Sequence, residues 1–266
     1  MKRIQFDLFP HGKRKAVTFS YDDGQIFDTR LAEMFDKYGV KCTFNLNSDN
    51  LGKRGYVDAS FVRELSARHE IACHTLTHPH LENLPLLQVT QEIYEDKCAL
   101  EDITGKPVCG MAYPFGTYNE GVKRVLRSVE ILYSRTTGIN PKFTFPQDDY
   151  EWHPNCHHRN AAEKAEQFLG IAGEMSLMYI WGHSFEFDRE KNWEFFEHLL
   201  GTVAGHDDIW YATNLELYDY RHAVQSLRIS AKGESVFNPS ALTVYASVDG
   251  VPTAFAPGLT KLKRMP

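Results

Sequence analysis

The sequence lacks several features that mark whole classes of protein. Its start, Met-Lys-Arg-Ile-Gln-Phe-Asp, has no apolar run of the roughly 7–15 residues typical of a signal peptide, and no later run approaches the ~18 apolar residues that span a bilayer. The five cysteines are odd in number and include no Cys-x-x-Cys pair, which argues against a disulfide scaffold or a cysteine zinc finger. Acidic residues outnumber lysine and arginine by 35 to 29, so nucleic acid is not expected as a partner. These absences predict a cytoplasmic protein with no membrane partner.

What the 266 residues do contain is an alternation of short β-rich runs and helical patterns. Repeated strand–helix units favour a parallel sheet, because parallel strands need crossover connections. Seven such strands predict an α/β fold of the distorted (β/α)7 barrel type, with an open doubly wound sheet as the alternative. The expected strands are Ala16–Tyr21, Lys41–Leu46, Glu70–Cys73, Val108–Tyr113, Ile131–Thr136, Leu177–Gly182 and Ile209–Ala212.

The pattern changes after residue 225. Apolar residues alternate with polar or small ones from Leu242 to Val248, and Asp249-Gly250 is a strong hairpin turn. We therefore expect a barrel over residues 1–225 and an antiparallel β-hairpin appendage with a tail over 226–266. Exposed edge strands in the appendage make a homodimer contact possible. The proline, glycine and aspartate content of residues 138–158 predicts one long loop.

Two groups of metal-binding residue types follow predicted strands. Asp22 and Asp23 stand at the end of the first strand, where two adjacent carboxylates are costly unless a cation neutralises one of them. His74 and His78 follow the third strand, at a spacing that lets two imidazoles share one ion. Carboxyl ends of parallel strands are where barrels place their sites. The pattern predicts a metal ligand beside a general base, although Asp22-Asp23-Gly24 alone is also typical of a turn before a helix.

Two further strand ends carry candidate groups. The fourth strand ends in Ala112-Tyr113-Pro114-Phe115-Gly116, a turn that can fix a backbone N–H toward a site. The sixth ends in Trp181-Gly182-His183, and a histidine there can supply a proton. Each has a structural alternative as a turn or a capping histidine, but four such features at four strand ends favour one shared site.

In this order and approximate spacing, Thr18–Gly24, His74–His78, Tyr113–Gly116 and His183 resemble the polysaccharide deacetylases, carbohydrate esterase family four. The resemblance spans roughly residues 14–222. It implies a distorted (β/α)7 barrel, a divalent metal that is usually zinc, and removal of an acetyl group from an N-acetylated sugar.

The resemblance also implies roles. Asp23, His74 and His78 are expected to bind the metal, and Asp22 to act as the catalytic base. The remaining implied residues are the Phe115 N–H for the oxyanion, His183 as the acid, and Tyr113, Trp152 and Trp181 in substrate binding.

The chain departs from the family pattern at Ala112, where an arginine commonly orients the base. Arg135, at the end of the fifth strand, is the expected replacement, and Arg159 is the other candidate. Asp148 and Glu151 could orient a histidine or an arginine, although surface loop acids are the simpler interpretation. Cys156-His157-His158 is expected to play no part in the site, whereas Glu186 and Asp188 could tune the nearby His183.

Three functions are compatible with these residues: the sugar deacetylase, a hydrolase of small linear or cyclic amides on the same fold, and a carbohydrate-binding protein without catalysis. The last is motivated by Ala112. The partner expected in each case is a carbohydrate or a small amide.

Overall fold

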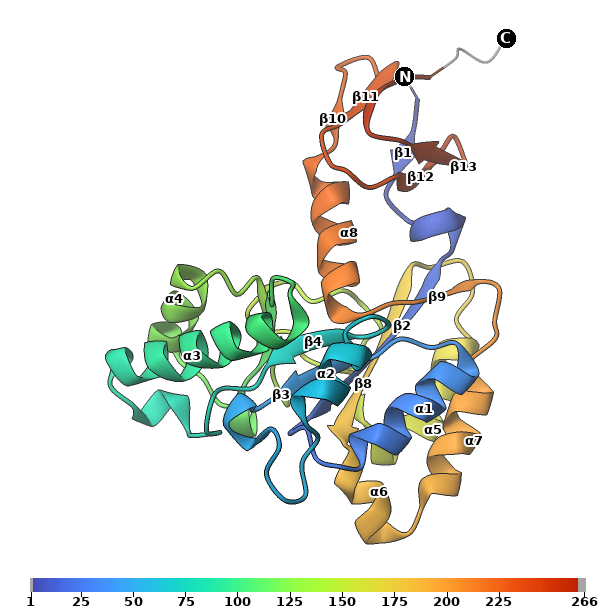
Figure 1. The fold of residues 1–266 in the computed structure, drawn as a ribbon. Coiled ribbons are helices and arrows are strands. Elements are labelled where there is room, and N and C mark those ends of the chain that lie inside the picture. Colours follow the sequence, from blue (N-terminus) through green and yellow to red (C-terminus); the bar gives the residue numbers. More distant parts are fainter. Residues whose placement is uncertain (1, 263–266) are drawn as a thin grey trace.

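A computed structural model describes residues 2–262 of the chain. Its central parallel sheet has the strand order β6-β5-β4-β3-β2-β8-β7, and β9 pairs with the first half of β2 (Figure 1). The bounds are β2 Lys15–Asp22, β3 Thr43–Leu46, β4 Glu70–Cys73, β5 Gly110–Ala112, β6 Tyr133–Arg135, β7 Cys156–His157, β8 Ser176–His183 and β9 Ile209–Tyr211. All seven predicted strands are present, with shorter bounds for most of them.

The sheet closes through a segment that the sequence did not identify as a strand. Trp152 exchanges backbone hydrogen bonds with the strand β6, since its N–H donates to Ser134 and its carbonyl accepts from Thr136, both at 3.0 Å. A few residues later, β7 pairs with β8. The expectation of one unbroken loop over 138–158 is therefore wrong at its end, where the chain joins the two edges of the sheet. The result is a distorted α/β barrel.

Helices cover the outside of the barrel because each carries one apolar face. They are α1 Asp28–Tyr38, α2 Ala59–Leu65, α3 Leu86–Thr104, α4 Glu120–Ser128, α5 Ala161–Leu169, α6 Ser184–Glu190, α7 Trp193–Val203 and α8 Asn214–Ser226. Both α1 and α3 end at a glycine, Gly39 and Gly105, in the left-handed conformation that glycine adopts without strain. Phe19 on β2, Phe35 on α1 and Phe196 on α7 pack together in the largest core cluster.

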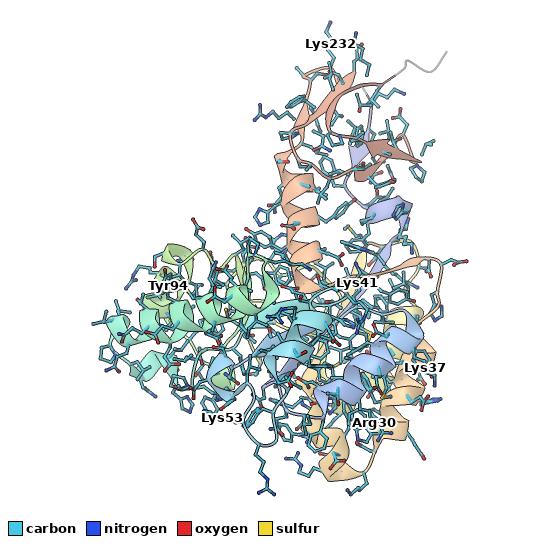
Figure 2. All side chains as sticks on the ribbon, in the orientation of Figure 1. Arg30, Lys37, Lys41, Lys53, Tyr94 and Lys232 are labelled. Atoms are coloured by element: carbon cyan, nitrogen blue, oxygen red, sulfur yellow. The ribbon has the colours of Figure 1, made fainter. Side chains whose placement is uncertain are left out.

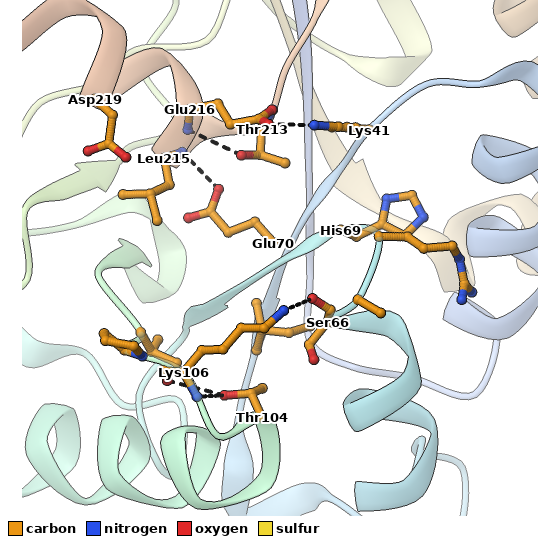
Figure 3. Close-up of a pocket in the computed structure, with 15 residues that line it drawn as sticks. Lys41, Ser66, His69, Glu70, Thr104, Lys106, Thr213, Leu215, Glu216 and Asp219 are labelled. Atoms are coloured by element: carbon orange, nitrogen blue, oxygen red, sulfur yellow. Dashed lines mark hydrogen bonds and ion pairs between the residues drawn. The ribbon is translucent and has the colours of Figure 1, made fainter. Parts of the chain in front are cut away.

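The helix α8 closes the amino-terminal end of the barrel. Thr213 and Glu216 form a capping box, and the Leu215 N–H donates to the buried Glu70 at 2.8 Å (Figure 3). Inside, the Asn214 side chain donates to the Tyr179 hydroxyl at 2.6 Å and accepts from Thr18 at 2.9 Å. The cavity in Figure 3, lined by Lys41, Glu70 and the first turn of α8, thus lies at the opposite end from the strand termini that carry the candidate residues.

Beyond α8 lie two small antiparallel sheets (Figure 1). One is β1 (Ile4–Gln5), β12 (Val244–Val248) and β13 (Val251–Phe255), and the other is β10 (Arg228–Ile229), β11 (Ser235–Asn238) and β14 (Gly258–Lys261). Asp249 and Gly250 make the expected hairpin turn, both with positive φ. In Figure 2, Lys232 of this appendage and Lys53, after the short helix η2 (Ser48–Asn50), lie at opposite ends of the molecule. Residues 263–266 of the predicted tail lie outside the described residues.

The capping box makes α8 sensitive to one hydroxyl. Thr213→Ala removes the oxygen that accepts from the Glu216 N–H, and we expect the free energy of unfolding to fall by about 1 kcal/mol in urea denaturation. Thr213→Ser keeps the hydroxyl and serves as the matched control, with a smaller loss. Equal losses in the two variants would show that the cap does not stabilise this helix.

Candidate active site

The metal-binding residue types predicted from the sequence come together at the carboxyl ends of β2 and β4. The Asp23 Oδ1 atom lies 3.6 Å from His74 Nε2 and 3.8 Å from His78 Nε2. The two imidazole Nε2 atoms are 3.1 Å apart. Three ligand atoms at these separations fit around one divalent cation, because ligands about 2.0–2.2 Å from a zinc ion lie roughly 3–3.5 Å from one another.

The surroundings of His74 favour metal binding. Its Nδ1 lies 2.8 Å from the Ala112 carbonyl oxygen, which can only accept a hydrogen bond, so the proton sits on Nδ1 and the Nε2 lone pair faces Asp23. Burial lowers the pKa of His74, which keeps the imidazole in the neutral form that a metal needs. We therefore identify Asp23, His74 and His78 as a set of residues that fits a divalent cation.

The backbone is strained at this point. Among residues 2–262, eight non-glycine residues have positive φ, and four of them surround the candidate metal site: Asp23, Thr75, His78 and Phe115. Such conformations cost about 1–3 kcal/mol each and persist where the surrounding structure enforces them. The left-handed conformation of Asp23 separates its side chain from that of Asp22, so that the two adjacent carboxylates have different partners.

Asp22 lies inside the barrel beside a guanidinium group. It is 2% exposed, forms an ion pair with the equally buried Arg135, and accepts a hydrogen bond at 2.8 Å from the Asn45 side chain. Burial alone would raise the pKa of Asp22, but the positive charges of Arg135 and His183 outweigh burial and lower it. Asp22 is thus a carboxylate held in its ionised form. Arg135 thus orients Asp22 in place of the arginine that is absent at Ala112.

His183 faces Asp22 from the end of β8. Its Nε2 lies 3.9 Å from Asp22 Oδ2, and its Nδ1 lies 3.4 Å from Glu186 Oε2. Burial would lower the pKa of His183, but the hydrogen bond with Glu186 and the charges of Asp22 and Asp23 raise it above its ordinary value. The imidazole can therefore carry a proton close to the ionised Asp22.

The remaining predicted site residues have different environments. Phe115 is 51% exposed in the turn after β5, with its ring 4.6 Å from that of His78, and Trp181 packs under the Arg135 guanidinium at 4.6 Å. Trp152, by contrast, is fully buried against Tyr133, and Tyr113 is buried with its hydroxyl donating to the Tyr150 carbonyl. Neither side chain can contact a substrate here. We therefore assign both to the core rather than to substrate binding.

Other predicted groups lie away from the site. Asp148 and Glu151 both accept from Lys123 at 2.7 Å and orient neither a histidine nor an arginine of the site. Arg159 pairs with Glu186 and Glu190 instead of Asp22.

Two residues that contact the site were not selected from the sequence. In the strand β3, polar Thr43 and Asn45 alternate with apolar Phe44 and Leu46, and this alternation is the signal that could have identified Asn45 as an inward polar residue. His157 was expected to have no role, but its Nε2 lies 2.8 Å from Glu186, the residue that faces His183.

Residues 10–134 match the family model described as polysaccharide deacetylase. A chitin deacetylase from Pestalotiopsis sp is 34% identical over 106 residues, which cover 39% of this chain and 35% of that protein. The matches to curated relatives span less than half of their length. These findings confirm the predicted resemblance to the polysaccharide deacetylase family, which implies a divalent metal.

Solved structures confirm the fold. A family 4 carbohydrate esterase from Streptomyces lividans aligns with a TM-score of 0.52 at 17% identity, covering 74% of this chain and 91% of the other. A structure titled Puue allantoinase aligns with a TM-score of 0.67 at 11% identity, covering 82% and 93%. Among the described residues, no helix is both long and apolar enough to cross a membrane.

A third carboxyl group behind the Asp22–Asp23 pair gives a testable pH dependence. Asp28 is fully buried at the start of α1. Burial raises its pKa to about 8, assisted by the charges of Asp23 and Asp22, although the nearby Ser184 side chain acts in the opposite direction. The folded protein therefore keeps this proton above the pH at which the unfolded chain loses it, and the Asp28 contribution to stability decreases as the pH rises from about 4 to about 8.

We expect Asp28→Asn to remove this dependence. The free energy of unfolding of the variant minus that of the original protein should increase by more than about 1 kcal/mol from pH 5 to pH 8. Urea denaturation at the two pH values measures this difference. Asp102→Asn, at an exposed position, is the control and should show no such gain. An identical pH dependence in Asp28→Asn and the original protein would contradict the raised pKa.

Proposed function

We propose that the protein is a metal-dependent hydrolase that removes the acetyl group from an N-acetylated sugar. The observation that carries the proposal is the placement of an ionised carboxylate, Asp22, directly beside a set of three residues fitted to a divalent cation. The family match over residues 10–134 supports this chemistry, and the chitin deacetylase relative supports an N-acetylated sugar as the substrate.

Asp23, His74 and His78 would hold the metal, which we propose to be zinc because two imidazoles and one carboxylate are ligands that zinc commonly takes. When bound, the ion supplies a Lewis acid that polarises the amide carbonyl and lowers the pKa of water. The other steps belong to residues of the chain. Asp22 accepts the proton of the attacking water, and Arg135 and Asn45 orient its two oxygens.

The leaving amine needs a proton, and His183 supplies it. The proposed acid, His183, and the proposed base, Asp22, lie 3.9 Å apart, so both can reach the same reacting amide. The Phe115 backbone N–H is the proposed donor to the oxyanion, at a residue held with φ of 58°. The products are then acetate and the free amine. Trp181 would form part of the pocket wall near the acetyl group.

The alternative of a non-catalytic carbohydrate-binding protein rested on Ala112. Since Arg135 supplies a guanidinium to Asp22, the alanine at position 112 no longer favours a non-catalytic protein. The small-amide alternative differs in substrate and is tested together with the sugar.

Zinc-loaded protein should release acetate from N-acetylglucosamine oligomers or peptidoglycan fragments, and a chelator should stop the reaction. Asp22→Asn should lower kcat by about a hundredfold or more while zinc content stays constant, since only the base is lost. The measurements are acetate release and metal content of the same samples. Turnover of cyclic imides or ureides with none of the acetylated sugars would favour the amide alternative, and an unaffected rate in Asp22→Asn would remove Asp22 from its role.

Arg135 is expected to set the pH range of the reaction. Removing the guanidinium in Arg135→Met raises the pKa of Asp22, so the acidic limb of the kcat/KM profile should move to higher pH, and activity at pH 7 should fall at least about tenfold. Arg135→Lys keeps a positive charge and should shift the limb less. The contradicting result is a pH profile of Arg135→Met that coincides with that of the original protein.

A further inference from the structure

A second group of two histidines and one carboxylate lies near His183, and its only link to the proposed reaction is the contact between Glu186 and His183. It consists of His157 at the end of β7, His158 in the short helix η5 (His158–Asn160), and Glu186 in the first turn of α6. One potential ligand atom from each lies within 4.8 Å of the others. The chemical composition equals that of the Asp23, His74 and His78 set.

The separations of the second group also fit one ion. Glu186 Oε2 lies 2.8 Å from His157 Nε2 and 3.4 Å from His158 Nε2. The second separation lies within the roughly 3–3.5 Å expected between ligands of a four-coordinate zinc ion, and the first is shorter, so His157 and Glu186 would move slightly apart to hold the ion. Two of the three residues are buried, and His157 is partly exposed, so an ion could reach the group from the side of His157.

His158 supplies an independent observation. Its side chain is fully buried, and neither ring nitrogen has a hydrogen-bond partner among the described residues. A neutral imidazole always presents one N–H and one lone pair, and leaving such a group unpaired in the interior costs about 1–3 kcal/mol. A cation on Nε2 would pair the lone pair that faces Glu186.

The ring of His158 is held in this orientation by its neighbours. It stacks on Phe187 with 4.2 Å between centroids, and its Nδ1 edge lies so close to Gly182 that a Cβ atom there would come within 2.0 Å. Only glycine at position 182 leaves room for the ring. The Nε2 atom is thereby directed away from β8 and toward Glu186.

The two arginines near Glu186 pair with one of its carboxylate oxygens, Oε1, and leave the other, Oε2, for a cation. Arg159 and Arg189 approach Oε1, at 2.6 Å and 3.4 Å, and both arginine side chains are about half exposed. The imidazoles all approach Oε2, where His183 Nδ1 also lies at 3.4 Å. One carboxylate oxygen has only two lone pairs and cannot accept well-formed hydrogen bonds from three imidazoles.

We infer that His157, His158 and Glu186 form a second divalent-cation site, selective for ions such as zinc or cobalt that accept imidazole ligands. The site joins the β7–η5 segment to α6 and fixes the carboxylate that faces His183. It is separate from the Asp23, His74 and His78 set, so it does not depend on the proposed deacetylation.

The test is to count zinc after loading and desalting, with circular dichroism to check folding. The unsubstituted protein should hold two zinc ions per chain, His74→Gln/His78→Gln should keep one, and His157→Gln/Glu186→Gln should also keep one. A surface pair, His198→Gln/Glu194→Gln, is the matched control and should keep two.

A single zinc in the unsubstituted protein, combined with none in His74→Gln/His78→Gln, would overturn the second site and leave the proposed function standing. An unchanged count in His157→Gln/Glu186→Gln would overturn it as well. If His157→Gln/Glu186→Gln does not fold, the second site is tested by cobalt titration of His74→Gln/His78→Gln, in which the second site is intact. Saturation at one cobalt with visible absorption supports the inference, and no cobalt absorption contradicts it.

Discussion

Asp22 and Asp23 place two carboxylates next to each other at the end of β2, where their charges repel. The arrangement of the site follows from giving each carboxylate its own partners. Asp22 continues the inward face of the strand and is neutralised by a buried guanidinium. Asp23 takes a left-handed conformation and faces two imidazoles instead. Without a positive partner for each, repulsion and burial would leave one of the two protonated.

The scaffold fixes these partners from separate parts of the chain. Arg135 comes from β6, the histidines follow β4, and His183 ends β8, so only a closed parallel sheet brings them together. Closure depends on the Trp152–His157 segment, which bonds to β6 at one end and to β8 at the other. The opposite end of the barrel is closed by the capped α8, which leaves the strand termini as the surface for chemistry.

The parts of this arrangement that are local in sequence could be predicted. Strand ends carrying Asp22, His74 and His183 are visible as apolar runs followed by polar residues, and Arg135 was predictable because it also ends a strand. The barrel closure was not predictable, because β7 has two residues and follows a proline- and glycine-containing stretch with no periodic pattern.

Side-chain direction was the other limit. Trp152 and Tyr113 were expected at the substrate, but their rings pack inward on Tyr133 and Tyr118. Adjacent residues were expected to diverge at His157 and His158, yet the turn into η5 brings both imidazoles to Glu186. Such orientations depend on tertiary packing, which one-dimensional spacing does not contain.

The convergence of Asp23, His74 and His78 on a single cation is the claim from which the rest follows. It is tested most directly by a crystal structure of zinc-loaded protein with anomalous diffraction data collected at the zinc edge. The account predicts an anomalous peak bonded to Asp23 and to the Nε2 atoms of both histidines, with Asp22 beside it but not bonded to it. A zinc ion coordinated by Asp22 instead, or no peak between the two imidazoles at saturating zinc, would contradict it.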